Sequence, residues 1–413
     1  MIFLFRFTLS LILGITLLIS CKKTEPVNIS MKDDVTLLAS DSLHGRQTGT
    51  PYEILAADYI ATRFENLGLE PKGTNGYFQQ FSFVDKSDPH GKVNFVNESD
   101  DNTVTGTNVI GYLNNNAENT VVIGAHYDHL GMGIEGSLFR GETKEIHNGA
   151  DDNASGVAAM LYLVKELQGA NTNNNYLFMA FSGEEMGLLG SNYFVKNPTI
   201  DLEKVNYMLN MDMVGRLNDE NTIAVHGVGT SPLFKQVLFA NKGSLIVKEH
   251  ESGVGPSDQT SFYLMDIPVL HFFTGQHEDY HKPSDDADKL NYEGMASITG
   301  FIESVITDLN DDGKLAFRKT KNESEEVPAF KVTLGVVPDY LFNGKGMRID
   351  GVSEDKPAQK AGMHKGDIVV KMGDYEVTDM MSYMKSLGKF EKGNSAKVTI
   401  KRNDELLVLD VTF

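Results

Sequence analysis

The sequence contains a single cysteine, Cys21, comparatively few basic residues, and one long apolar stretch, which lies close to the N-terminus. With one cysteine, no disulfide can form within the chain, even in an oxidising compartment. The 37 basic residues are outnumbered by 57 acidic residues, for a net charge of −20, which argues against nucleic acid or an anionic membrane surface as a partner. Non-covalent packing must therefore stabilise the fold.

The apolar stretch runs from Phe7 to Ile19, and Arg6 is the only charge before it. It is shorter than the roughly 20 residues that a membrane-spanning helix needs, and its flanks are typical of a signal peptide. It ends in Leu18-Ile19-Ser20-Cys21, which resembles a bacterial lipoprotein cleavage box. We predict a signal peptide over residues 1–21, lipidation at Cys21, and an exported cell-envelope lipoprotein that faces the periplasm. Membrane contact is then limited to the lipid anchor; the alternative is an uncleaved membrane anchor.

Short apolar runs without alternation punctuate the chain after residue 120. Such runs are typical of strands buried on both faces, as in a parallel sheet covered by helices. Helical patterns fall between them: Thr50, Pro51 and Glu53 form a capping signature, and further helices are expected near 155–168 and 188–195. The pattern predicts an α/β domain with a mostly parallel central sheet flanked by helices. The four runs cover residues 121–123, 176–181, 205–211 and 267–273.

Metal-type ligands follow these runs. In open parallel sheets, binding residues collect at the carboxyl ends of the strands, so we expect the ligands to meet at one edge. Each motif alone is a modest signal, but their order and placement together indicate a metal site. The candidates are His126 with Asp128, Asp151 with Asp152, Glu184 with Glu185, Asp212, and His281.

The ligand types suggest how the roles divide. The Asp128 carboxylate, two residues after His126, can fix the tautomer of that imidazole. Asp151 and Asp152 lie between small residues, where one carboxylate can bridge two cations and the metal charge relieves their mutual repulsion. Adjacent glutamates at the end of an apolar strand are costly unless positive charge lies beside them.

A count of ligands predicts two ions. Zinc takes about four ligands, and a catalytic zinc keeps one position for water. His126, Asp151 and Asp212 can hold one ion, and Asp151, Glu185 and His281 the second, with Asp151 bridging. Glu184 remains free to take a proton from metal-bound water, whose pKa the cation lowers to about 7. We predict two Zn²⁺ per chain, with Co²⁺ or Mn²⁺ as alternatives.

Residues from Asp41 to about Leu309 resemble the zinc-dependent aminopeptidase family, which includes bacterial leucyl-type aminopeptidases and, more distantly, glutamate carboxypeptidases and glutaminyl cyclases. The resemblance implies the same ligands, with Asp151 bridging and Glu184 as general base, and a peptide bond between Asp151 and Asp152 that is often cis. It is carried by the strings Gly124 to His129, Asn148 to Gly156, Phe181 to Gly187, Asn210 to Gly215, and Tyr280 to Asp285.

The family implies an exopeptidase, most simply an aminopeptidase that hydrolyses the first peptide bond of peptide substrates with water deprotonated by Glu184. One alternative is a glutaminyl-cyclase-like acyltransferase with a single zinc, but the intact string from Asp151 to Gly156 favours hydrolysis. The other is a non-catalytic peptide-binding protein on a decayed scaffold, which should have lost ligands, and none is missing.

Several polar residues near these motifs are assigned lesser roles. His129 and His147 lie close to ligands in sequence, but a loop histidine is more often a bystander. His271 is expected to be buried in its strand. Ser257 and Asp258 match a Ser-Asp pair common in the family, although Gln259 stands where many relatives carry histidine.

The C-terminal residues form a second domain. We predict a peptidase domain over residues 22–312, a charged linker over 313–328, and a small β-rich domain over 329–413 that resembles a PDZ domain. The resemblance lies in Gly351-Val352, Pro357-Ala358, Ala361-Gly362 and Lys365 to Val369. PDZ domains bind extended peptides, usually C-termini, beside a carboxylate-binding loop. Here Leu334, Gly335, Val336 and Val337 take that position, so a C-terminal peptide is a candidate ligand; the alternative is a packing domain that binds no peptide.

Overall fold

The computed structural model describes residues 30–84, 95–96, 103–321, 331–339, 341–342, 344–353 and 355–413. The predicted signal peptide and its lipidation site, Cys21, lie outside the described residues. Within those ranges, no helix is long and apolar enough to cross a membrane.

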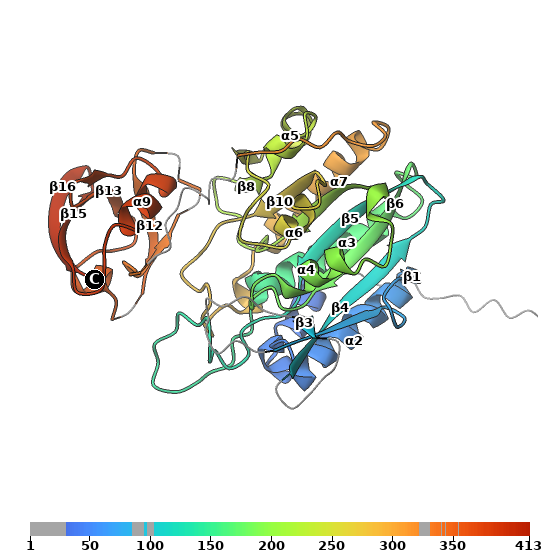
Figure 1. Cartoon of the computed structure of the whole chain (residues 1–413), viewed down its shortest axis with the longest axis horizontal. Helices are drawn as coiled ribbons and strands as arrows, with labels where there is room; N and C mark the ends of the chain where they lie inside the picture. Colours follow the sequence, from blue (N-terminus) through green and yellow to red (C-terminus); the bar gives the residue numbers. More distant parts are fainter. Residues whose placement is uncertain are drawn as a thin grey trace, which may run out of the picture.

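A large mixed sheet forms the centre of the first domain (Figure 1). Among the described residues its strand order is β3-β2-β4-β6-β5-β7-β10-β8-β9, and β1 pairs with β4. The central strands β6, β5, β7 and β10 are parallel, and β4 and β8 pair antiparallel on either side. The predicted mostly parallel sheet is confirmed. The bounds are β1 Glu70–Pro71, β2 Phe78–Val84, β3 Phe95–Val96, β4 Thr103–Leu113, β5 Asn119–His126, β6 Asn174–Phe181, β7 Val205–Met211, β8 Thr222–His226, β9 Ile246–His250 and β10 Val269–Phe273.

Helices cover both faces of this sheet. Helices α1, α2, α3, α5 and α7 share one hydrophobic core with it, while α4 and α6 contribute to a second core on the opposite face. The α-helices are α1 Met31–Leu38, α2 Pro51–Asn66, α3 Gly156–Leu167, α4 Leu189–Lys196, α5 Phe234–Asn241, α6 Gln259–Tyr263 and α7 Tyr292–Asp308. Short helical turns are η1 Asp41–Arg46, η2 Ala150–Ser155, η3 Leu202–Lys204, η4 Val228–Thr230 and η5 Ala287–Lys289.

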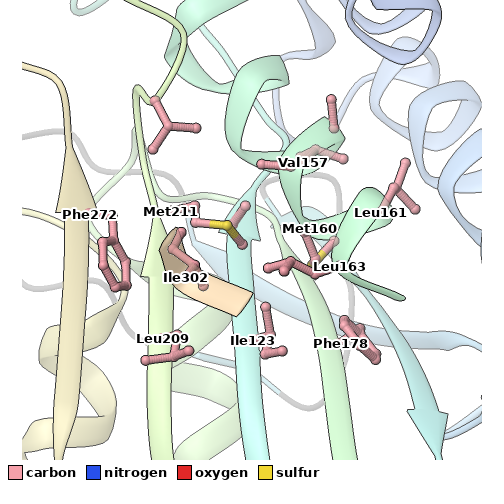
Figure 2. Packing of buried hydrophobic residues seen from close by; sticks show 14 of the residues in the cluster. Ile123, Val157, Met160, Leu161, Leu163, Phe178, Leu209, Met211, Phe272 and Ile302 are labelled. Atoms are coloured by element: carbon pink, nitrogen blue, oxygen red, sulfur yellow. The ribbon is translucent and has the colours of Figure 1, made fainter. Parts of the chain in front are cut away.

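The central strands show why their sequences do not alternate. In β5, Ile123 belongs to the core under α3, whereas its neighbour Val122 belongs to the core on the other face. Successive side chains of a strand point to opposite faces, and here both faces are buried. Figure 2 shows Ile123 and Phe178 of adjacent strands beneath Met160 of α3.

The start of α2 follows the predicted capping pattern. The Thr50 side chain accepts a hydrogen bond from the Glu53 backbone N–H, and Pro51 occupies the first helical turn. Glu53 itself is fully buried: one carboxylate oxygen accepts from Gly49 N–H, and the other accepts from Thr107 N–H in strand β4. The cap therefore also fixes the helix to the sheet.

The C-terminal domain has its own antiparallel sheet, order β11-β12-β13-β15-β16 with β14 beside β13, and its own core. Strand β11 begins at Val336, because Leu334 turns into the core and Gly335 adopts a φ of +76°. The elements are β11 Val336–Pro338, β12 Met347–Val352, β13 Ile368–Met372, β14 Tyr375–Glu376, β15 Ser395–Arg402, β16 Glu405–Thr412, α8 Pro357–Lys360 and α9 Met380–Leu387.

The first part of the predicted linker packs against the first domain. Leu315 belongs to the core of that domain, and Arg318 N–H donates to the Thr230 carbonyl. Thr320 contacts the Tyr263 hydroxyl. Residues 322–328 of the linker lie outside the described residues.

Arg46, at the end of η1, is a fully buried cation whose hydrogen-bond acceptors, among the described residues, are all backbone carbonyls. It donates to the carbonyl oxygens of Leu38, Tyr127, Asn148 and Gly149. Burial lowers the pKa of Arg46 to about 10, with the charge of Asp128 acting in the opposite direction, so the guanidinium stays protonated at neutral pH. One side chain thus joins the end of strand β5 to the loop that carries Asp151 and Asp152.

We predict that Arg46→Met lowers the free energy of unfolding by about 3 kcal/mol or more, because several buried carbonyls lose their donor. Urea denaturation of the purified chain measures this change. The control is Arg140→Met, since Arg140 is exposed and should change stability by less than about 0.5 kcal/mol. Equal stability of the two variants would contradict the role assigned to Arg46.

Candidate metal centre

The predicted ligands meet at the carboxyl ends of the central parallel strands. His126 is the last residue of β5, and Asp212 follows β7 directly. Glu184 and Glu185 follow β6, while the loop after β10 carries His281. Parallel neighbours end at the same edge, so these side chains converge although they lie up to 155 positions apart in the sequence.

Asp152 lies at the centre of this cluster. Its Oδ1 is 3.3 Å from His126 Nε2, and its Oδ2 is 3.3 Å from His281 Nε2. His126 Nε2 is also 3.4 Å from Asp212 Oδ1, and His281 Nε2 is 3.3 Å from Glu185 Oε2. The two carboxylate oxygens of Asp152 therefore face two separate pairs of ligands.

The assignment of Asp151 as the bridging residue is corrected by this geometry. Asp151 points the other way: its Oδ1 accepts a hydrogen bond from Gly215 N–H, and its Oδ2 lies 3.1 Å from His277 Nε2. Neighbouring residues in this irregular segment diverge, so only one of them enters the cluster. The cis peptide bond lies between Asp152 and Asn153, not between the two aspartates.

Backbone carbonyls orient the two imidazoles. His126 Nδ1 is 3.2 Å from the carbonyl oxygen of Asp128, and His281 Nδ1 is 2.9 Å from that of Gly136. Both contacts favour a proton on Nδ1 and leave Nε2 to bind a metal. Asp128 was expected to orient His126 through its carboxylate, but that group is 3.7 Å from Nδ1, so the carbonyl makes the closer contact.

The Asp128 carboxylate positions the Glu184 segment instead. It accepts hydrogen bonds from Glu184 N–H and from the Thr48 hydroxyl. Thr48 in turn contacts the Ser182 hydroxyl, whose Oγ donates to buried Glu53. This network joins the end of β6 to the start of α2.

The electrostatics of the cluster call for positive charge. Burial raises the pKa of Glu184 well above its ordinary value, and repulsion from Asp212 adds to the effect. Burial alone would lower the pKa of His126, but Asp212 and Glu184 raise it well above the ordinary value. Burial would likewise lower the pKa of His281, and Glu185 raises it. The carboxylates thus favour protonated imidazoles, and bound metal cations would offset the same negative charge.

The distances fit zinc. Zn–N and Zn–O bonds of about 2.0–2.2 Å place neighbouring atoms of a tetrahedral site roughly 3.3–3.5 Å apart. The four contacts of Asp152, Asp212 and Glu185 with His126 and His281 measure 3.3–3.4 Å. Glu185 Oε1 is a further buried carboxylate oxygen at the cluster.

Three buried residues lie at the site in addition to the predicted ligands. His129 was expected to be a bystander, but its Nδ1 lies 2.9 Å from Glu185 Oε1. Asp258 is fully buried, and burial raises its pKa to about 7. Asp285 accepts from the backbone N–H groups of Asp151 and Asp152 and so holds their loop. Asp258 and Asp285 lie within strings noted in the sequence, but no spacing rule distinguishes them from surface aspartates.

The other residues singled out in the sequence lie outside the ligand cluster. His147 contacts the Ser137 hydroxyl in the loop beside the site, and His271 is buried in β10 as predicted. In the C-terminal domain, Leu334 and Val337 of the predicted peptide-binding loop are buried in the core, while Val336 is half-buried in β11.

Comparisons with known proteins agree with this geometry. Residues 108–306 match the model of peptidase family M28, and residues 315–413 match that of the PDZ domain. Leupeptin-inactivating enzyme 1 of Streptomyces exfoliatus is 30% identical over 335 residues, which cover 74% of this chain and 72% of that protein.

Other curated relatives align over shorter regions. The alkaline phosphatase isozyme conversion protein of Escherichia coli is 28% identical over 50% of this chain and 56% of its own length. A probable leucine aminopeptidase of Trichophyton verrucosum is 32% identical over 39% of this chain and 44% of its own length. The chain thus spans about half the length of these two relatives.

Solved structures share the fold. A Zn-dependent exopeptidase from Parabacteroides distasonis superposes with a TM-score of 0.54 at 16% identity, covering 68% of this chain and 97% of that one. Bacteroides thetaiotaomicron glutaminyl cyclase gives 0.53 at 16% identity over 67% and 97%. At such identities the likeness concerns the fold alone. The family model and the long alignment to the Streptomyces enzyme establish membership: the chain belongs to peptidase family M28.

Proposed function

We propose that the chain is a zinc-dependent aminopeptidase that removes N-terminal residues from peptides. The observation that carries the proposal is Asp152, whose two carboxylate oxygens each lie 3.3 Å from a different histidine. His126, Asp152 and Asp212 would hold one ion, and Asp152, Glu185 and His281 the other. Bound zinc would supply a Lewis acid for the peptide carbonyl and lower the pKa of water.

Glu184 is the residue suited to move the proton. Among the described residues, Glu184 belongs to neither group of clustered ligands, and its backbone N–H donates to the Asp128 carboxylate. Its carboxylate would take a proton from the attacking water and deliver it to the nitrogen of the leaving amine. Asp128 is then a positioning residue, acting through Glu184.

The surroundings of the site suit the N-terminus of an apolar peptide. The cavity beside the cluster is lined by Glu184, Glu185 and Asp212, which favour a substrate ammonium group. Met213, Phe273 and Tyr280 line the same cavity and would contact an apolar first side chain. Relatives described as probable leucine aminopeptidases support this preference.

We predict that Glu184→Gln lowers kcat by about 10²–10⁴-fold, the usual contribution of a general base. The zinc content should equal that of the wild type, because Glu184 is outside both ligand sets. Hydrolysis of leucine p-nitroanilide and metal analysis measure the two effects. Glu142→Gln, an exposed residue, should behave as the wild type. Near-normal turnover of the Glu184 variant would contradict the assignment.

Substitution of the adjacent aspartates distinguishes the two candidates for the bridge. Asp152→Asn should reduce bound zinc from two ions to less than one per chain, because both sites lose a ligand. Asp151→Asn should retain the metal, since the amide oxygen can still accept from Gly215 N–H. Metal analysis by mass spectrometry after dialysis provides the readout. Loss of zinc only in the Asp151 variant would restore the assignment made from the sequence.

The metal content of the unaltered chain also tests the two alternative functions. Two ions agree with the aminopeptidase. One ion would favour a glutaminyl-cyclase-like acyltransferase, and none would favour a non-catalytic peptide-binding protein.

Export and lipid anchoring are proposed from the N-terminal sequence. This proposal is supported by the charge-poor apolar stretch before Cys21. We predict that Cys21→Ser moves the protein from the membrane fraction to the soluble fraction when the full chain is expressed in a bacterium. Retention at the membrane would instead favour an uncleaved N-terminal anchor.

A further inference from the structure

A second cavity, of about 660 Å³, lies between the two domains and adjoins the candidate metal centre. His226 and Pro256 line both this cavity and the one that contains Glu184 and Asp212. The C-terminal domain lies on the side of the large sheet where β8 is found (Figure 1), and the Leu341 side chain lies against Gly275 of the first domain. The two cavities are therefore neighbours with a common wall.

A row of three imidazoles connects them. His271 pairs with His226 across β10 and β8, and His226 pairs with His250 across β8 and β9. The rings of His226 and His250 stack at 4.3 Å, and those of His226 and His271 at 5.4 Å. His271 lines the metal-site cavity, His250 lines the interdomain cavity, and His226 lines both.

These imidazoles are suited to hydrogen-bond a peptide backbone. Burial lowers the pKa of His226 well below its ordinary value, so it carries one donor and one acceptor at neutral pH. His271 is 2% exposed, and neither of its ring nitrogens has a hydrogen-bond partner among the described residues. Buried polar atoms of this kind usually have a partner, and a bound ligand can supply one here.

Helix α9 forms the opposite, apolar wall. Met380, Met381 and Met384 line the cavity, together with Phe342. The carboxylates on this wall are engaged within their own domain: Asp339 accepts from Arg348, and Asp379 caps α9. Methionine side chains are flexible and fit apolar groups of different shapes, so the wall suits apolar side chains of varied sequence.

We propose that the interdomain cavity binds the residues that follow the first residue of a peptide substrate, as an extended stretch with apolar side chains. The imidazole row faces the peptide backbone, and α9 contacts the side chains. The inference rests on the proposed aminopeptidase function and extends it, because the C-terminal domain becomes part of the substrate site. A cavity of this volume is within the range of about 300–1,000 Å³ that encloses drug-sized ligands.

Met381→Glu tests the proposal in the zinc-loaded full chain. Met381 lines the cavity but is outside the core of its domain, and a glutamate in the first turn of α9 favours the helix. For an amidated peptide of five apolar residues, kcat/KM should fall at least about tenfold, the effect of a lost apolar contact and a desolvated charge. For leucine p-nitroanilide, which has no peptide residues after the first, kcat/KM should stay unchanged.

Two further variants complete the comparison. Leu406→Glu introduces the same charge at an exposed apolar position of β16 and should leave kcat/KM unchanged for both substrates. His250→Ala alters the other wall and should again slow only the pentapeptide. The proposal is overturned if the pentapeptide reacts equally well in Met381→Glu and the wild type.

Direct binding separates this inference from the proposed function. Anisotropy of a labelled, amidated pentapeptide is measured on zinc-loaded Glu184→Gln, with and without Met381→Glu. At least about tenfold weaker binding of the pentapeptide to the double variant supports its binding in the interdomain cavity. If the wild-type chain hydrolyses no peptide, only the proposed aminopeptidase function is overturned. Equal binding overturns the cavity. Binding of only the free-acid peptide would also overturn it, and would favour capture by the loop at Leu334–Val337.

Discussion

The structure depends on compensating the charge of carboxylates that are buried beside one another at the ends of the central strands. Asp128, Asp152 and Asp258 are almost completely buried, and Glu184 and Glu185 lie next to them. An uncompensated buried charge costs several kcal/mol. The raised pKa values of His126 and His281 show how strongly the carboxylates attract positive charge. Metal cations at this edge of the sheet would neutralise the carboxylates, so metal binding would increase the stability of the folded chain.

The position of Asp152 depends on residues that are not ligands. Arg46 holds the carbonyls of Asn148 and Gly149, and Asp285 accepts the N–H groups of the two aspartates that follow. Asp151 secures the segment after β7 through Gly215. Three buried charged groups thus fix one irregular loop so that a single carboxylate faces two histidines. Arg46 and one carboxylate oxygen of each of these aspartates are hydrogen-bonded to the loop or to the segment beside it, which favours a single loop conformation.

In the proposed function, each domain binds a different part of the peptide substrate. The first domain concentrates negative charge where an ammonium group and metal ions are expected, and its imidazole row extends from that cavity to the interdomain cavity. The second domain has an independent core and presents methionines from α9 at the neighbouring cavity. In the proposed arrangement, strong electrostatics act only at the scissile bond, while apolar contacts act further along the peptide.

Several features follow from the sequence alone. Non-alternating runs such as 176–181 predict strands buried on both faces, and parallel strands bring His126, Asp212 and Glu185 to one edge. The sequence could not distinguish Asp151 from Asp152, because the φ and ψ angles of an irregular loop decide which adjacent side chain points inward. Nor could it reveal the role of Arg46 or the row formed by His226, His250 and His271, because their partners are distant in the chain. Local patterns determined the elements and the ligand types; strand register and loop packing, which exist only in the folded chain, decided which atoms meet.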